Sequence, residues 1–381
     1  MSPAGTTPAG GGSALKPVLA RLAAGERLAE HESEVAFGVV MEGAATAAQI
    51  AALVMAMRVR GETVAELEGA VRAMRARMRT VPGVADAIDV CGTGGDNHGT
   101  LNVSTAVAFV LAALGVPVAK HGNRALSSRA GASDTLEALG VPLHDDPAVL
   151  ERLLQEQGIA FLSAPLHHPA MRHAAPVRAE LGTRTIFNLL GPLCNPAGVR
   201  RQMIGLFDAR WAEPVVAVLR RLGAERVWAV HGNDALGGSA QGLDELTLAG
   251  PSDVVALENG EVHRFTIEPE RLGLARRPVS DIWGGDAIGN AEALESLLRG
   301  ATGAYRETVL LNASAALQVS GKGNMLRTPD GEALHAMLRE GMAHAARTLD
   351  DGSALAVLER LRAGSDIPRE DDVAIGAIHG G

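Results

Sequence analysis

The apolar positions near the start of the chain recur at the spacing of one helix face. Between residues 15 and 78 an apolar residue returns every three or four positions, with polar residues between, as on helices buried along one side. A clear example is Ile50, Leu53, Val54 and Met57. We therefore predict an all-helical domain over residues 14–82, after a flexible tail at residues 1–13 that is rich in Gly, Pro, Ala and Thr.

Two of the predicted helices also carry start signals. Thr46 with Gln49, and Thr63 with Glu66, have the spacing of a capping box. In this motif the hydroxyl and the later side chain bond amides that the first helical turn leaves free. The helical pattern stops at residues 81–83, where Pro and Gly are expected to break it.

Beyond this break, short apolar runs alternate with Gly-rich loops and helical patterns. Strands are predicted at 88–91, 116–119, 203–207 and 226–230, with a buried helix opening near Ser104. This alternation is typical of an α/β domain with a central, largely parallel sheet. We expect the domain to comprise residues 83–165 and 195–381, while a helical segment near 166–190 returns to the N-terminal domain.

A Gly-rich loop follows the first predicted strand and leads into the buried helix. Gly92, Gly94 and Gly95 let backbone amides approach an anion closely. Asn102, Ser104 and Thr105 then add donors where the helix dipole favours negative charge. The loop suits a phosphate, although three glycines in isolation would favour an ordinary glycine turn with a serine cap.

A second loop, Lys120-His-Gly-Asn-Arg-Ala-Leu-Ser-Ser-Arg129, is equally rich in phosphate donors. Loops at the carboxyl ends of parallel strands converge on one crevice, so both loops are expected to face a common ligand. Neither is a Walker motif or a dinucleotide fingerprint. Adjacent Asp244 and Glu245 could hold magnesium, which takes one or two carboxylates together with phosphates and waters; alone they would be solvated surface.

Composition narrows the class of protein. Hydrophobic residues are 47% and charged residues 21% of the 381 positions, as in a globular protein with a full core. A net charge of −9 and only 3% aromatic residues disfavour nucleic acid as a partner. The most apolar stretch, 105–119, is too short to span a membrane, and no secretory signal is seen. A cytoplasmic location is expected, with Cys91 and Cys194 reduced.

Taken together, the motifs resemble a known family. The segments are Gly92-Thr-Gly-Gly-Asp96, Asn102-Val-Ser-Thr105, Lys120-His-Gly-Asn-Arg124, His168-Pro-Ala-Met171, Arg184-Thr-Ile-Phe-Asn188, Gly191-Pro192 and Asp244-Glu245. In order and approximate spacing they resemble the anthranilate phosphoribosyltransferase family. The resemblance extends from residue 15 to the last predicted helices.

This resemblance implies an activity and an assembly. Family members transfer the phosphoribosyl group of phosphoribosyl pyrophosphate (PRPP) to the amine of anthranilate, a step of tryptophan biosynthesis. The implied fold has a small all-helical domain and a larger α/β domain like that of nucleoside phosphorylases. The implied partners are PRPP, anthranilate and a second copy of the chain, bound through the helical domains, and the implied cofactor is Mg²⁺, with two ions per active site.

The resemblance also assigns site residues. The PRPP site would comprise Gly92, Gly95, Asp96, Thr100, Asn102, Val103, Ser104, Thr105, Lys120, His121, Gly122, Asn123, Arg124, Ala125, Leu126, Ser127, Ser128 and Ala132. Anthranilate would contact Gly92, Asn123 and Arg178. Ser104 and Glu245 resemble the ligands of one magnesium ion, and Asp244 and Glu245 those of the other. No catalytic residue is assigned beyond substrate and metal alignment, because an aromatic amine is already a neutral nucleophile.

Two features depart from the family pattern. Ala132 stands where relatives commonly have Ser, with Ser133 next, which puts one phosphate contact in doubt. The link at 231–242 is longer than usual and could alter magnesium affinity. A substituted anthranilate remains conceivable as acceptor. Two other proteins would share this architecture: a pyrimidine nucleoside phosphorylase, and a nucleic-acid-binding relative without enzymatic activity. The acidic net charge and the retained carboxylates disfavour the nucleic-acid-binding relative.

Overall fold

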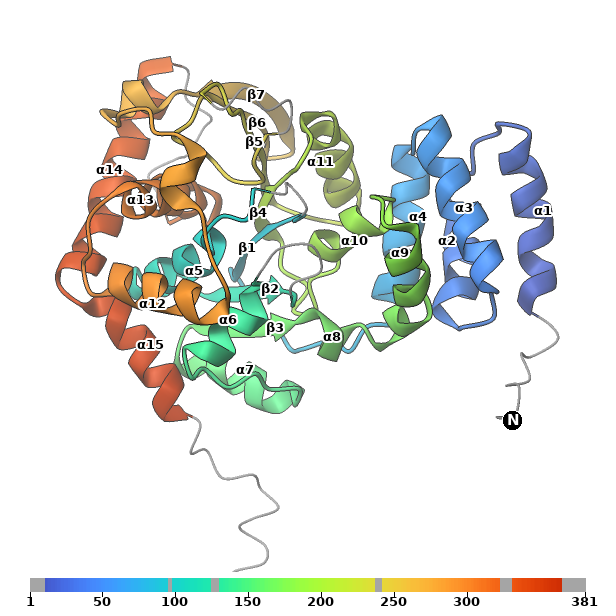
Figure 1. Cartoon of the computed structure of the whole chain (residues 1–381), viewed down its shortest axis with the longest axis horizontal. Coiled ribbons are helices and arrows are strands. Elements are labelled where there is room, and N and C mark those ends of the chain that lie inside the picture. Colours follow the sequence, from blue (N-terminus) through green and yellow to red (C-terminus); the bar gives the residue numbers. More distant parts are fainter. Residues whose placement is uncertain (1–10, 95–97, 125–129, 237–241, 323–330, 365–381) are drawn as a thin grey trace, which may run out of the picture.

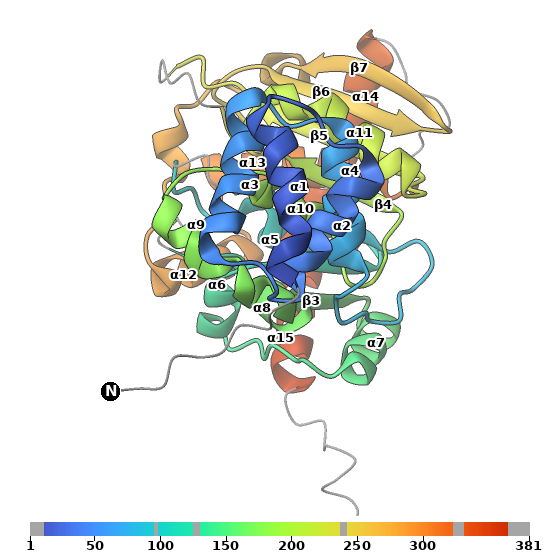
Figure 2. The ribbon, with the colours of Figure 1, turned by 90° about the vertical axis from the view of Figure 1, so that its right-hand side faces the viewer.

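The computed structural model describes residues 11–94, 98–124, 130–236, 242–322 and 331–364. The chain begins with four helices, α1 (Gly11–Ala23), α2 (Glu30–Met41), α3 (Ala47–Arg60) and α4 (Val64–Arg75). They form a bundle at one end of the molecule (Figures 1 and 2). Both predicted capping boxes are confirmed, since Thr46 and Thr63 cap α3 and α4 and exchange hydrogen bonds with Gln49 and Glu66. The N-terminal helical prediction is correct.

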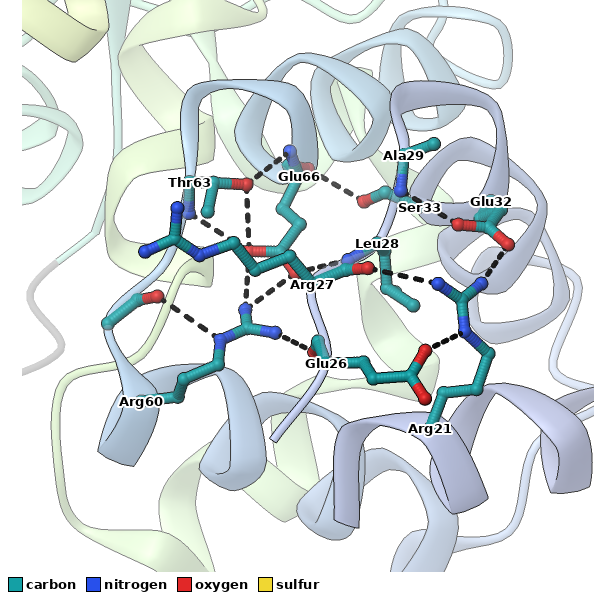
Figure 3. A network of polar contacts seen from close by, with 11 residues as sticks. Arg21, Glu26, Arg27, Leu28, Ala29, Glu32, Ser33, Arg60, Thr63 and Glu66 are labelled. Atoms are coloured by element: carbon teal, nitrogen blue, oxygen red, sulfur yellow. Dashed lines mark hydrogen bonds and ion pairs between the residues drawn. The ribbon is translucent and has the colours of Figure 1, made fainter. Parts of the chain in front are cut away.

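A buried carboxylate connects the helices of this bundle. The Glu66 side chain is 0% exposed and accepts hydrogen bonds from Leu28 N at 2.9 Å, Thr63 N at 2.9 Å and Arg60 Nη2 at 2.6 Å. Ser33 Oγ donates to the Glu66 carbonyl at 2.7 Å. Figure 3 shows how these contacts join the α1–α2 connection to α2, α3 and α4. A buried carboxylate is tolerated here because both Glu66 carboxylate oxygens accept hydrogen bonds from these donors.

Glu66→Ala is expected to destabilise the protein by about 3 kcal/mol, because it leaves the Arg60 guanidinium and the amides of Leu28 and Thr63 without their acceptor. Glu66→Gln should lower the free energy of unfolding by less, since the amide keeps one acceptor oxygen. Urea unfolding of both variants measures these changes in stability. Glu359→Ala, at an exposed position of α15 (Ser353–Ala363), is the control. A Glu66→Ala midpoint equal to that of the control would contradict this role.

A seven-stranded sheet forms the centre of the second part of the chain. Its strands, in the order in which they neighbour one another, are β3 (Ile159–Ser163), β2 (Val118–Gly122), β1 (Ile88–Gly92), β4 (Arg201–Gly205), β5 (Arg226–Gly232), β6 (Ser252–Glu258) and β7 (Glu261–Ile267). Neighbours from β3 to β5 are parallel, and β6 and β7 are antiparallel. The α/β prediction is confirmed, and the four predicted strands exist with shifted ends. Strands β3, β6 and β7 were not predicted.

Helices cover both faces of the sheet. On one face lie α5 (Val103–Ala113), α13 (Ala304–Val319), α14 (Gly331–Asp350) and α15, and on the other α10 (Phe187–Leu193) and α11 (Ala212–Arg221) (Figure 1). Alternate strand residues enter opposite cores: Met203 faces α5 and α13, whereas Ile204 faces α11 and the bundle. This alternation follows from the two-residue repeat of a strand.

The remaining elements connect these layers. They are α6 (Ala132–Ala138), α7 (Pro147–Glu156), α8 (Ala164–His167), α9 (Ala175–Leu181), α12 (Ala287–Leu298) and the 3₁₀ turns η1 (Pro169–His173), η2 (Ala209–Trp211), η3 (Pro269–Leu272) and η4 (Val279–Ile282). In the described part of the chain, no helix is long and apolar enough to cross a membrane.

The segment from α8 to α10 lies against the helical bundle. Phe187 of α10 contacts Phe37 of α2 edge to face, with ring centroids 5.7 Å apart. Arg75 Nε donates to Leu193 O at 2.8 Å, and Arg79 N donates to His167 O at 2.8 Å. Residues of this segment share a buried core with the bundle. These helices therefore bring the bundle close to the carboxyl ends of the strands.

Candidate active site

A cleft of about 550 Å³ opens between the carboxyl ends of the strands and the returning helices. Parallel register aligns the ends of four strands: Gly92 pairs with Gly205, and Gly122 with Ser163. The strand order reverses between β1 and β4, the position at which open α/β sheets bind ligands.

The described residues of the predicted site all line this cleft. They are Gly92, Thr100, Asn102, Val103, Ser104, Thr105, Lys120, His121, Gly122, Asn123, Arg124, Ala132, Arg178, Asp244 and Glu245. Gly95, Asp96, Ala125, Leu126, Ser127 and Ser128 lie outside the described residues. The two predicted loops and the predicted acceptor arginine are thus brought to one cavity.

The carboxylate turn at residues 244–245 sits directly over the ends of β1 and β4. A Cβ on Gly92 would overlap the Asp244 carboxylate, and one on Gly205 would overlap its carbonyl. Both positions need glycine because the turn approaches so closely. Gly94 N donates to Asp244 Oδ2 at 2.7 Å. These contacts link the turn to the Gly-rich loop.

The residues present fit a magnesium ion that is completed by its substrate. Ser104 and Glu245 line a small cavity next to the cleft, and Asp244 is adjacent. Among the described residues, no group of three or more His, Cys, Asp or Glu side chains could hold a metal. Magnesium often keeps waters and takes only one or two carboxylates along with phosphate oxygens. The donors Ser104, Asp244 and Glu245 are of the type this mode requires.

Lys120 lies deeper than predicted. It belongs to β2 and not to the loop that follows, and its side chain is only 2% exposed. Its Nζ donates to Val90 O at 2.8 Å. Strand pairing with β3 continues to Gly122, which extends β2 beyond the apolar run visible in the sequence. The ammonium therefore forms part of the cleft floor.

A buried carboxylate below the cleft floor was not predicted from the sequence. Asp89 is 0% exposed and accepts hydrogen bonds from His121 N at 3.0 Å and from Asn195 Nδ2 at 2.8 Å. Burial raises the pKa of the Asp89 carboxyl, while the Lys120 ammonium and these donors oppose the rise. Asp89 thereby connects β1, β2 and the chain before β4.

Arg124 points at acidic side chains of α6. It donates to Asp134 at 3.1 Å and to Glu137 at 2.9 Å. Asn123 Oδ1 accepts from the Arg124 amide at 2.8 Å. A phosphate that recruits the Arg124 guanidinium would have to compete with these carboxylates.

Two histidines form a buried pair in the cleft wall. His121 Nε2 and His168 Nε2 are 3.1 Å apart, and His121 Nδ1 lies 3.1 Å from Gly191 O. Burial lowers the pKa of His121 well below its ordinary range, and burial lowers the pKa of His168 to about 4. Both rings are neutral near neutral pH. The sequence placed His168 in a family motif but gave no sign of its contact with His121.

This pair predicts a loss of stability in acid. The pKa of His168 is lower in the folded state than in the unfolded state. Neutral His168 therefore contributes stability at pH values above its ordinary pKa of 6.5, and this stability is lost as the pH falls towards about 4. The loss should approach about 3 kcal/mol, at 1.36 kcal/mol per pKa unit. Urea unfolding from neutral to acid pH should show a flatter dependence for His168→Gln than for the wild type. Parallel curves would contradict the assignment.

Arg178 of α9 also lines the cleft. Its Cζ lies 5.8 Å from the centroid of the Phe187 ring. Burial lowers the pKa of its guanidinium. Among the described residues it has no ion-pair partner, unlike Arg124.

The two departures from the family pattern also have structural positions. Ala132 is the first residue of α6 and lines the cleft, whereas Ser133 is 2% exposed and its Oγ lies 3.3 Å from Ser163 Oγ. Ser133 therefore does not replace a missing serine at 132. The long link is anchored where Gly232 and Leu243 exchange two backbone hydrogen bonds; residues 237–241 lie outside the described part.

Comparisons with known proteins agree with this architecture. Residues 16–78 match the family described as "Glycosyl transferase family, helical bundle domain", and residues 84–355 match "Glycosyl transferase family, a/b domain". The anthranilate phosphoribosyltransferase of Gluconobacter oxydans (strain 621H) is 56% identical over 93% of this chain and 97% of its own length.

Solved structures show the same likeness. Anthranilate phosphoribosyltransferase from Thermus thermophilus is 41% identical, with a TM-score of 0.80 over 91% of this chain and 98% of its own. The Saccharomyces cerevisiae enzyme in complex with PRPP and Mg is 25% identical, with a TM-score of 0.79 over 92% and 97%.

Proposed function

The chain belongs to the anthranilate phosphoribosyltransferases, and we propose that its cleft binds PRPP beside the sheet and anthranilate beside the returning helices. Membership rests on a relative that is 56% identical over almost the whole chain. One observation carries the placement of the substrates: the two phosphate-type loops, the carboxylate turn and Arg178 line the same cavity. The activity is transfer of the phosphoribosyl group to the amine of anthranilate, a step of tryptophan biosynthesis.

In this proposal the phosphates of PRPP face the β1–α5 loop and the end of β2. The first turn of α5 offers backbone amides, which have no partners within a helix. Thr105 supports this assignment, because its buried Oγ1 has no hydrogen-bond partner in the described part of the chain. Asn102, Ser104 and Asn123 would add side-chain donors at the same end of the cleft.

Two magnesium ions would be held by few protein ligands. Ser104 and Glu245 would bind one, and Asp244 and Glu245 the other, as the resemblance implies. When bound, magnesium neutralises charge on the departing pyrophosphate. Glycine at 92 and 205 supports this placement, because it lets the carboxylates reach the phosphate end of the cleft.

Anthranilate would lie between Gly92, Asn123 and Arg178. A guanidinium can bind the anthranilate carboxylate through two parallel N–H bonds and fix the direction of the amine. The amine nitrogen then forms a bond to ribose C1 as the bond from C1 to the pyrophosphate oxygen breaks, and the nitrogen loses a proton. Alignment supplies much of the rate, because both reactants are held in one cavity.

The first test is the loss of anthranilate fluorescence when the protein is mixed with PRPP and magnesium. Turnover that requires both components supports the proposal and shows that Ala132 is tolerated. PRPP binding without turnover would contradict anthranilate as the acceptor. Absence of PRPP binding would contradict the proposed phosphoribosyltransferase site. Thymidine and uridine with phosphate serve as controls, since phosphorolysis would indicate a nucleoside phosphorylase.

A homodimer through the helical domains is also proposed. Val35 of α2 is 60% exposed and Val59 of α3 is 83% exposed, so the bundle carries apolar surface that a second copy could cover. Light scattering should give the mass of two chains, and the mass of one chain would contradict it. The domain limits at residues 14–82, 83–165 and 195–381 and the cytoplasmic location stay predictions.

A further inference from the structure

Asn102 lines the cleft and is held by two side chains that do not line it. It precedes α5, but its side chain does not cap that helix. Its Oδ1 instead accepts from Thr135 Oγ1 of α6 at 2.8 Å and from Asn290 Nδ2 of α12 at 3.0 Å. Thr135 is 0% exposed and Asn290 is 2% exposed. Two fully buried side chains from distant parts of the chain thus contact one cleft residue.

The direction of these hydrogen bonds follows from chemistry alone. Gly285 N, which can only donate, lies 2.8 Å from Asn290 Oδ1. The amide group of Asn290 is thereby oriented, and its NH₂ must face Asn102. The atom of Asn102 that meets this NH₂ must then be its oxygen. Asn102 lines the cleft, and its NH₂ makes no hydrogen bond to another described residue, so this group is free to bind a ligand there.

The segment that carries Asn290 also holds the backbone of the phosphate loop. Gly284 N donates to Gly99 O at 2.8 Å, and Leu101 N donates to Ile282 O at 2.8 Å. Tyr305 Oη donates to Asn102 O at 3.1 Å. The loop end is therefore supported at both its backbone and its side chain.

We propose that Asn290 and Thr135 are positioning residues that fix the Asn102 amide with its NH₂ group, and not its oxygen, presented to the anionic oxygens of the phosphoribosyl donor. This rests on the proposed function and adds two residues that do not touch the substrate. A phosphate accepts hydrogen bonds and cannot donate to an amide oxygen when fully ionised. The wrong orientation of Asn102 would repel it, so orientation has a direct effect on donor affinity.

Asn290→Asp tests the orientation. The carboxylate still accepts from Gly285 N but presents an oxygen to Asn102, which should turn the Asn102 NH₂ away from the cleft. Thr135→Val removes one donor without changing shape, and Thr135→Ser restores it. We expect Asn290→Asp to raise the KM for PRPP about tenfold or more, the effect of losing a charge-assisted hydrogen bond. Thr135→Val should raise it less, while the KM for anthranilate changes little in either.

A double-mutant cycle with Asn102→Ala separates positioning from general support. If Asn290 acts through Asn102, Asn290→Asp should add little to the KM for PRPP of Asn102→Ala. Additive effects, equal increases in both KM values, or a Thr135→Ser variant as impaired as Thr135→Val would overturn the proposal. Melting temperatures show whether each variant folds. If Asn290→Asp does not fold, the KM for PRPP of Thr135→Val still tests the proposal.

The proposed function and this inference can fail separately. Wild-type turnover tests the former, whereas calorimetric titration with PRPP and magnesium compares the variants with the wild type even without turnover. Equal PRPP affinity in the wild type, Asn290→Asp and Thr135→Val would overturn the positioning role while leaving the proposed function intact.

Discussion

Replacing Asp244 and Glu245 together by Asn and Gln is expected to lower kcat by about 10³ and to abolish the steep response to magnesium, since removing a single preorganised group at a developing charge typically costs 10²–10³. The carboxylates are the described acidic side chains that line the cleft. Pyrophosphate leaves with increased charge, which an Asn and a Gln cannot help to neutralise through bound metal. The amides nevertheless keep similar size, and the side chain introduced at position 244 retains an oxygen for Gly94 N.

Initial rates across a magnesium titration measure this effect. The control is Glu359→Gln, a charge-neutralising change at an exposed position of α15, which should leave the titration unchanged. Thermal melts of all proteins check folding. A double variant with wild-type magnesium dependence would show that the metal is bound elsewhere.

Arg178→Ala is expected to lower kcat/KM for anthranilate by about 100-fold, because losing one partner of a partly desolvated charge pair costs about 2–5 kcal/mol. The KM for PRPP should change little. Arg178→Lys should recover only part of the loss, because an ammonium cannot form two parallel bonds to a carboxylate. Initial rates with each substrate varied in turn measure these values.

The matched control for Arg178 is a change of substrate. An aromatic amine without the carboxylate cannot use the guanidinium, so the wild type and Arg178→Ala should turn it over at similar, low rates. If the variant loses as much activity towards this amine as towards anthranilate, Arg178 supports the cleft wall and does not bind the carboxylate.

Local sequence predicted those features that depend on neighbours in the chain. The starts of α3 and α4 followed from Thr46 and Thr63, since a capping box closes within one helical turn. The helix after the Gly-rich loop, α5, was visible because the surrounding residues are mostly apolar. The order of phosphate motifs and the carboxylate pair identified the family, and relatives covering more than nine-tenths of the chain confirm it.

Other features depend on contacts that the sequence does not display. Strand β3 is a buried run of only five residues, too short to distinguish from the end of α7 by periodicity. Lys120 looked like a loop cation because its charge is visible in the sequence, whereas its contact with Val90 O depends on the pairing of β1 and β2.

By itself, then, the sequence determined the N-terminal helical domain, the α/β character of the second domain, the family and the types of residue at the site. Only the tertiary structure decided which partners orient the site residues. Asn290 lies 188 positions from Asn102 and has no motif of its own. His168 and His121 become a neutral pair because packing removes water from both rings. Desolvation and hydrogen-bond direction are set by the whole surroundings of a group, and long-range packing creates those surroundings.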